Sequence, residues 1–261
     1  MHTTGLSPNS MSVYLSAVRS AHVMMGMQEP IIRSPQVKLA LKAVKDSAGP
    51  PNQKMPITYD ILKQMIFMLR GDREEKLWSA ILSLAFFAGL RGAEYAAVSM
   101  QGHVTYPKLS SISYNIIQGA KVMQYTIHKS KTQVHAYSVP VGCTRVRVCA
   151  YCMIYDYIKV KFAGPVSPHM PLFTFHDKSM VYKSHVNFTI KRLLRLLGYD
   201  ISKYTTHSLR AGAATTAASM GFTDWEIMRV GGWRSAAYRQ YIRQVDSLVA
   251  GLSARLATTL N

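Results

Sequence analysis

The stretch that decides the fold lies late in the chain and reads His207-Ser208-Leu209-Arg210, then Gly231-Gly232-Trp233, then Tyr238-Arg239-Gln240-Tyr241-Ile242-Arg243. A histidine and an arginine three positions apart share one helical face, so both side chains can reach a single phosphate. A tryptophan N–H and two phenols follow within the next segment. These groups supply a nucleophile, donors for the non-bridging oxygens and a proton carrier, which phosphoryl transfer to a protein side chain requires.

The composition favours a polyanionic partner. Hydrophobic residues make up 48% of the 261 residues, enough to bury a sizeable core in one large domain or two small ones. There are 31 Lys and Arg against 13 Asp and Glu, a net charge of +18, and cationic side chains that neutralise phosphates gain affinity by releasing counterions. A ribosomal, membrane-surface or merely soluble basic protein would have the same balance. The apolar run Trp78–Leu90 is too short to span a membrane, and we expect neither membrane association nor a signal peptide.

Several motifs occur in the order in which the tyrosine recombinases, or phage integrase family, carry them. They are Leu84-Ala85-Phe86-Phe87 with Leu90-Arg91, Ser130-Lys131-Thr132, His207-Ser208-x-Arg210, Gly212-Ala213-Ala214, Gly231-Gly232-Trp233 and Gln240-Tyr241-Ile242-Arg243. From about Ser7 to Asp246 the chain resembles this family; the C-terminal motifs are Cre-like, and the earlier ones look closest to DIRS-type retroelement recombinases. The resemblance implies a site-specific DNA recombinase or integrase that cuts and rejoins double-stranded DNA through a 3′-phosphotyrosyl intermediate. It also implies no metal or nucleotide cofactor, and a homo-oligomer that is a tetramer on two DNA duplexes.

The resemblance also implies individual roles. Arg91 and Arg210 would stabilise the charge on the attacked phosphate, and Glu94 would orient neighbouring groups. His207 would hydrogen-bond the phosphate or take the proton of the tyrosine. Trp233 would donate to a phosphate oxygen. Each residue has a plainer interpretation: Arg91 can form an ion pair with Glu94, a lone histidine is more often structural, and Trp233 can be a core residue, as we expect for Trp78 and Trp225.

A lysine on the turn between two strands completes the implied catalytic set. Lys131 would protonate the departing 5′ oxygen, with Lys129 as its rival. Both can instead be solvated turn lysines that contact phosphate non-specifically. Further DNA contacts are expected from one basic helix and from the segment after the second tyrosine; these residues are Lys191, Arg192, Arg195 and Arg243.

Two tyrosines compete for the role of nucleophile. Tyr238 lies five residues after Trp233 and Tyr241 lies eight after it, whereas the usual separation in the family is nine. The flanking Ile242-Arg243 favours Tyr241, and Tyr238 would then pack in the core or contact DNA.

Helical periodicity and turn signals predict a mixed α/β, mostly helical fold. The run from Leu77 to Leu90 is apolar nearly all round and predicts a buried helix, Gln118-Gly119 is a turn signal between two strands, and the basic helix is expected from Phe188 to Leu197. We expect a partial helical core-binding domain at 1–49, a Gly-Pro-Pro linker at 50–56 and the catalytic domain, with a three-stranded antiparallel sheet, at 57–261. Only two helices precede the linker, which implies a fragment, a degenerate copy or a truncated gene model. A leucine stripe at Leu248, Leu252 and Leu256 predicts a terminal helix with an apolar face. The resemblance implies that this helix docks on another protomer; the alternative is that it folds back on its own domain.

The three cysteines, Cys143, Cys149 and Cys152, are too few for a disulfide scaffold and suggest a reducing compartment. Cys149 and Cys152 form a lone Cys-x-x-Cys, which we interpret as two cysteines at the start of a helix rather than a zinc site. The expected location is the nucleus for a eukaryotic mobile element, and otherwise inside the cell on DNA. Two rival functions stay open: a domesticated, non-catalytic DNA-binding protein and an enzyme similar to the type IB topoisomerases.

Overall fold

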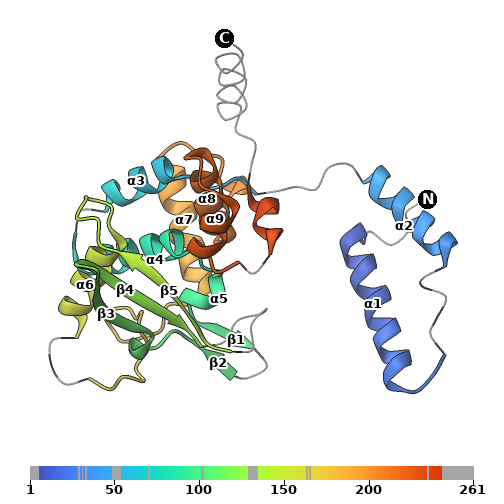
Figure 1. Ribbon diagram of the computed structural model, residues 1–261, viewed down its shortest axis with the longest axis horizontal. Helices are drawn as coiled ribbons and strands as arrows, with labels where there is room; N and C mark the ends of the chain where they lie inside the picture. Colours follow the sequence, from blue (N-terminus) through green and yellow to red (C-terminus); the bar gives the residue numbers. More distant parts are fainter. Residues whose placement is uncertain are drawn as a thin grey trace, which may run out of the picture. The chain divides into compact units, whose positions relative to one another are not determined.

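The structure, a computed structural model, describes residues 6–28, 30, 32, 34–48, 54–69, 71–100, 103–128, 135–162, 164, 166–233 and 235–242 (Figure 1). The chain divides into two compact units, Met1–Gln53 and Lys54–Asn261. The predictions for Lys129, Lys131, Arg243 and the terminal leucine stripe lie outside the described residues, and these predictions stay as they stand.

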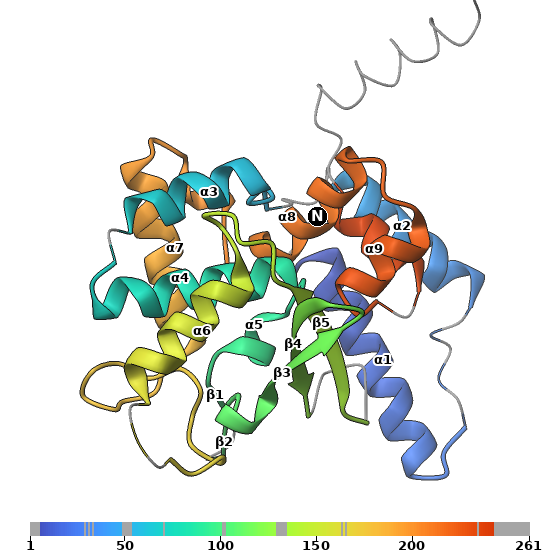
Figure 2. The same ribbon diagram turned by 60° about the vertical axis from the view of Figure 1, so that its left-hand side comes forward.

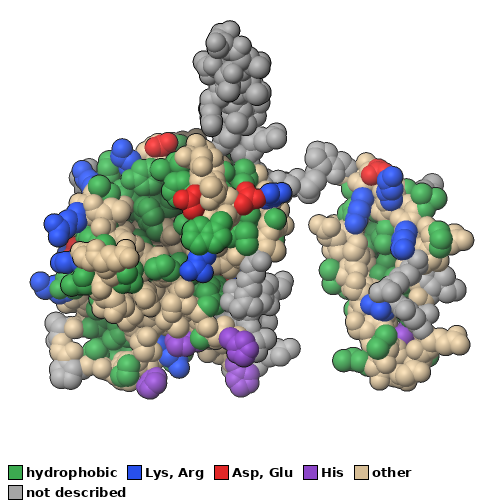
Figure 3. Space-filling view, in the orientation of Figure 1, with side chains coloured by type: hydrophobic (Ala, Val, Ile, Leu, Met, Phe, Trp, Pro, Cys, Tyr) green, Lys and Arg blue, Asp and Glu red, His purple; other side chains and the backbone are tan. Residues whose placement is uncertain are grey.

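The first unit is a pair of helices, α1 (Pro8–Met24) and α2 (Pro35–Ser47). Both begin in the same way, because a serine side chain before the helix accepts a backbone N–H of the first turn and a proline follows it. Neither helix buries a side chain completely. Three exposed lysines on α2 recur at helical spacing, Lys38, Lys42 and Lys45, and Lys and Arg side chains gather on the visible face of this unit (Figure 3).

The core of the second unit forms around α4 (Arg73–Phe87). Asp72 and Glu75 form a capping box that begins the helix four residues before the predicted apolar run. Nine consecutive or near-consecutive side chains from Leu77 to Phe86 are buried, as expected of a helix that is apolar all round. The helix contacts α6 (Ala150–Lys161) and α8 (His207–Ser219), and α3 (Tyr59–Met68) packs beside it (Figure 2).

The predicted three-stranded antiparallel sheet is confirmed. Its strand order is β3 (Ile112–Ile117), β4 (Ala120–Ile127) and β5 (Tyr137–Gly142). Gln118 and Gly119 join the first two strands with φ of 50° and 79°, the pair of positive angles that a two-residue hairpin turn requires. A second hairpin, β1 (Val98–Met100) with β2 (His103–Thr105), was not predicted.

Six further helical elements complete the described part of this unit. They are α5 (Gly92–Tyr95), α7 (Lys183–Leu196), α9 (Asp224–Val230) and the 3-10 helices η2 (Leu109–Ser111), η3 (Ile201–Lys203) and η4 (Ala236–Tyr241). The basic helix expected from Phe188 begins five residues earlier, at Lys183. Trp78 is buried as predicted, but the prediction for Trp225 is wrong: this indole is 69% exposed on α9. No helix among the described residues combines the length and apolarity needed to cross a membrane.

A close backbone contact fixes the depth at which α8 sits. The N–H of Ile57 donates to the carbonyl of Ser208 at 2.9 Å. A Cβ on Gly212 would lie 1.7 Å from the carbonyl oxygen of Ile57. Glycine is therefore required where α8 crosses the segment that enters this unit, and the first turn of α8 can lie deep in the core.

Gly212→Ala should lower the free energy of unfolding by about 2–3 kcal/mol, because the added methyl group must push two backbones apart. Urea unfolding followed by circular dichroism measures this loss. Gly142→Ala is the matched control, since nothing lies within 4 Å of the Cβ added there. Equal stability of the two variants would show that the backbones separate without cost.

Candidate active site

Arg210 occupies the centre of the site. Its side chain is fully buried in the first turns of α8. Nη1 donates to the carbonyl of Gly231 at 3.0 Å and to the carbonyl of Gly89. Burial, together with the neighbouring positive charge of Arg91, lowers the pKa of Arg210 to about 10, so the guanidinium remains charged at neutral pH.

Glycines allow these carbonyls to approach the guanidinium. Gly89 lies two residues after α4 with φ of +54°, and a Cβ there would lie 2.8 Å from the Cα of Gly231. A Cβ on Gly231 would lie 1.7 Å from the Trp233 ring, and one on Gly232 would lie 2.8 Å from the Tyr137 ring. The pair Gly231-Gly232 before Trp233 is therefore a steric requirement of this turn.

Arg91 is held at the start of α5 by Glu94. The carboxylate accepts the backbone N–H of Arg91 at 2.8 Å and its Nη1 at 3.0 Å. Glu94 is buried, whereas 22% of the Arg91 side chain is exposed. The Tyr125 hydroxyl donates to the backbone carbonyl of Glu94 and ties α5 to the sheet. The ion pair considered from sequence is present, and it fixes the position of Arg91 while leaving part of its guanidinium accessible.

His207 lies at the first position of α8, and Thr205 precedes the helix. The hydroxyl of Thr205 accepts the His207 N–H at 3.2 Å, and the Thr205 N–H donates to the Ser208 hydroxyl at 3.0 Å. Burial lowers the pKa of His207, and the positive charges of Arg210, Lys183 and Arg91 act in the same direction. The imidazole is therefore biased towards its neutral form, which can accept a proton.

The two tyrosines occupy different environments. Tyr238 is fully buried and packs edge-on against Trp233, with ring centroids 6.0 Å apart. Tyr241 is partly exposed, and its ring centroid lies 5.7 Å from that of His207 and 6.1 Å from that of Trp233. The Arg210 guanidinium lies 5.8 Å from the Tyr241 ring.

The structure thus brings together Arg91, Glu94, His207, Arg210, Trp233 and Tyr241 of the predicted site. The predicted DNA contacts Arg192 and Arg195 are exposed on α7, and Lys191 is half-buried there.

Three further residues adjoin the site without having been singled out. The stem of Lys183 passes over Gly92, where an added Cβ would lie 3.0 Å from its Cε. Tyr137 is placed against Gly232, and the Thr215 hydroxyl donates to the carbonyl of Tyr241 at 3.1 Å. No local motif marks these residues, because they reach the site through tertiary packing from α7, β5 and the third turn of α8.

Several buried donors at the site have no partner within the described part of the chain. They are Nε and Nη2 of Arg210 and Nε1 of Trp233. The Arg210 guanidinium lies over the Trp233 ring at 4.1 Å, so these N–H groups belong to one cluster. Buried donors are almost always satisfied in native proteins. A cluster of such donors beside the cationic side chains of Arg91 and Lys183 and the phenol of Tyr241 suits an oxyanion such as a phosphodiester.

Solved structures with the same fold are tyrosine recombinases. The XerA recombinase matches with a TM-score of 0.55 and 17% identity, over 96% of this chain and 76% of that one. The Tn1549 transposon integrase in complex with circular intermediate DNA matches with a TM-score of 0.58 and 14% identity, over 95% of this chain and 80% of that one. The XerH site-specific recombinase bound to difH substrate matches with a TM-score of 0.53 and 13% identity, over 96% of this chain and 71% of that one. No family model and no curated protein matches the sequence. At these identities the likeness establishes the fold, which is that of the tyrosine recombinases.

Lys183→Met should raise the pKa of His207, because it removes one of the positive charges that disfavour the imidazolium. The pKa of His207 is depressed in the folded protein, so protonation of this histidine destabilises the fold. Removing the Lys183 charge makes that destabilisation smaller. NMR titration of the imidazole, assigned with His207→Gln, measures the change. Lys191→Met, on the same helix, is the control and should leave the titration of His207 unchanged. If the pKa of His207 does not rise in Lys183→Met, the charge of Lys183 does not act on this histidine.

Proposed function

We propose that this chain is a DNA strand-breaking and rejoining enzyme, a site-specific tyrosine recombinase or integrase that works through a 3′-phosphotyrosyl intermediate. The observation that carries the proposal is the cluster of unpaired buried donors on Arg210 and Trp233 beside the ring of Tyr241. This cluster, in a tyrosine-recombinase fold, supports the roles proposed for a nucleophile and for donors to an attacked phosphate.

In the proposed reaction, the Tyr241 oxygen attacks phosphorus and the 5′ oxygen leaves. Arg91 and Arg210 grip the non-bridging oxygens, and the charge that builds up in the pentavalent transition state strengthens these contacts. Trp233 donates a further hydrogen bond, and neutral His207 receives the phenolic proton. Lys131 is proposed to protonate the leaving oxygen, with Lys129 as the alternative. No step needs a metal or nucleotide, since the phosphotyrosyl bond conserves the energy of the broken strand.

Tyr241 is the better nucleophile of the two tyrosines on the grounds of access. Tyr238 is enclosed by the small core cluster of Ala214, Ala217, Ile227 and Trp233, where a DNA phosphate cannot reach its oxygen. Tyr241 lies at the end of η4 next to the cationic groups. We therefore assign Tyr238 to packing.

The proposed partner is double-stranded DNA. The solved neighbours include integrase and recombinase complexes with DNA, and the net charge of +18 fits a polyanion. The exposed α2 lysines and the basic residues of α7, with Arg243 and the lysine turn, would contact phosphates. Assembly as a tetramer on two duplexes, a mobile-element origin close to the Cre-like or DIRS-type recombinases, and location in the nucleus of a eukaryotic host belong to the same proposal.

Tyr241→Phe should abolish the covalent protein–DNA adduct on a pool of nicked suicide duplexes of randomised sequence, whereas Tyr238→Phe should retain it. The site of covalent attachment can also be identified directly, because trypsin cleaves between the two tyrosines and leaves them on different peptides. Tyr238 falls in the peptide Ser235–Arg239 and Tyr241 in Gln240–Arg243. Mass spectrometry of the nuclease-trimmed adduct should find the nucleotide on the second peptide. Modification of the first would overturn the assignment, and duplex binding without any adduct would favour a domesticated, non-catalytic protein.

Arg91→Lys and Arg210→Lys should each slow adduct formation by about 10²–10³-fold, because the charge stays but the planar fork is lost in the transition state. Affinity for the same duplex should change by about tenfold or less, since one phosphate contact contributes little to the total. Filter binding and single-turnover cleavage measure the two effects. Arg73→Lys, exposed at the start of α4, is the matched control. Equal losses in affinity and rate would reduce both arginines to ordinary phosphate contacts.

Relaxation of supercoiled plasmid distinguishes the topoisomerase-like alternative. A recombinase should join pairs of recognition sites and relax plasmid poorly, whereas an enzyme similar to the type IB topoisomerases should relax it repeatedly as a monomer.

A further inference from the structure

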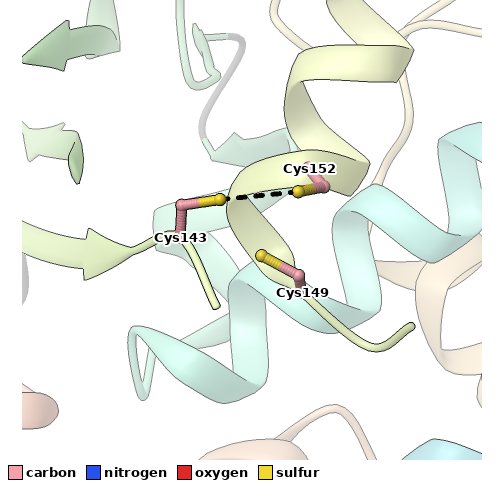
Figure 4. Close-up of side chains that lie close together, drawn as sticks. All are labelled: Cys143, Cys149 and Cys152. Carbon is pink, nitrogen blue, oxygen red and sulfur yellow. Dashed lines mark hydrogen bonds between the residues drawn. The ribbon is translucent and has the colours of Figure 1, made fainter. Parts of the chain in front are cut away.

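The three cysteines of the chain lie together, away from the proposed catalytic residues. Their sulfur atoms are all within 4.8 Å of one another, and the Sγ atoms of Cys143 and Cys152 are 3.7 Å apart. Figure 4 shows the three thiols pointing towards a common space between the end of β5 and the start of α6. Because the sequence holds no other cysteine, every thiol of the chain belongs to this cluster.

The backbone fixes the position of each thiol. Cys143 directly follows β5, and its N–H donates to the carbonyl of Lys121 at 2.8 Å, which extends the strand pairing. Cys149 is the N-cap of α6, and Cys152 lies in its first turn. A Cys-x-x-Cys at the start of a helix places both sulfurs on one side. The strand end supplies the third sulfur.

One pair of sulfurs has the spacing found in a zinc thiolate site. Tetrahedral Zn–S bonds of about 2.3 Å place two sulfurs roughly 3.8 Å apart, close to the 3.7 Å between Cys143 and Cys152. A disulfide requires an S–S distance of about 2.05 Å, and all three cysteines are free. All three thiols lie within 4.8 Å of one another, close enough to share one ion.

Backbone donors around Cys149 are those that a bound thiolate needs. The Thr144 N–H donates to Cys149 Sγ at 3.4 Å, and the Cys152 backbone N–H also faces this sulfur. Such hydrogen bonds orient metal ligands and disperse their charge. Cys149 is buried, whereas Cys143 and Cys152 are half-exposed, so an ion can enter from solvent and meet a prearranged inner ligand.

We propose that Cys143, Cys149 and Cys152 form a zinc site with solvent at the fourth position. Within the part of the chain that the structure describes, no His, Asp or Glu joins the three sulfurs, and three thiolates select a soft or borderline ion such as Zn²⁺ over Mg²⁺ or Ca²⁺. The ion would link β5 to α6. The site is separate from the proposed DNA chemistry and does not depend on it.

The test uses the full chain. Protein purified from zinc-supplemented medium should retain about one zinc ion per chain by elemental analysis. Replacement of zinc by Co²⁺ should give thiolate charge-transfer absorption and the visible d–d bands of a tetrahedral site. Zinc added to stripped protein at about 100 times its Kd should raise Tm by roughly 5–10 °C.

Variants identify the ligands. Cys143→Ser, Cys149→Ser and Cys152→Ser should each weaken zinc binding by about a hundredfold or more. Met153→Leu removes a neighbouring sulfur on the same helix and should bind zinc like the parent protein. Circular dichroism shows whether each variant folds, and the cobalt spectrum of the unsubstituted protein decides the question without any variant.

Two results would overturn the proposal. One is folded protein that takes up no zinc and gives no cobalt charge-transfer band. The other is a thiol count of one rather than three in denatured, unreduced protein, because this would mean that two of the cysteines form a disulfide.

Discussion

The burial of one cation, Arg210, constrains how the other elements of the second unit are arranged. An isolated buried charge is costly, and it is tolerated only where dipoles or opposite charges surround it. Here the carbonyls of Gly89 and Gly231 and the face of Trp233 surround it. The end of α4, the first turns of α8 and the turn after α9 must therefore meet at one guanidinium. The small side chains at these positions follow from that requirement.

The same constraint organises the proposed chemistry. Because Nη1 is committed to the two carbonyls, the guanidinium is fixed with Nε and Nη2 free for a substrate. Arg91 is fixed independently, through Glu94, which is itself tied to the sheet by Tyr125. Each arginine thus has its own support, and neither must reorganise when a phosphate arrives. Such preorganisation is a main source of catalytic power in charged transition states.

Sequence patterns predicted those elements whose local sequence preference is the same as the structure they adopt in the folded chain. The apolar run ending at Leu90 predicted a buried helix, and Gln118-Gly119 predicted the hairpin, whose two turn residues both have positive φ. The strands of the β1–β2 hairpin have three residues each, too few to show alternation. The exposed position of Trp225 depends on how the short helix α9 packs, which no local pattern records.

The candidate site divides in the same way. Arg91, His207, Arg210, Trp233 and Tyr241 stand in motifs, so resemblance located them. Lys183, Tyr137 and Thr215 reach the site from elements whose local sequence serves packing, and only the folded chain shows them. The cysteine cluster also required the structure, because its third member lies on a strand end that no Cys-x-x-Cys pattern includes.

Strand β5 connects the two proposed sites. At its start Tyr137 borders Gly232, next to Trp233 and the guanidinium, and just past its end Cys143 meets the thiols of α6. The same α6 packs along α4, and α4 ends at Phe87, two residues before Gly89, whose carbonyl accepts from Arg210. A bound zinc ion would therefore link β5 to α6, which packs on α4 and so connects to the segment that holds Arg210. In that arrangement the metal would take no part in the chemistry, and its contribution would be to hold rigid the frame in which Arg210 is buried.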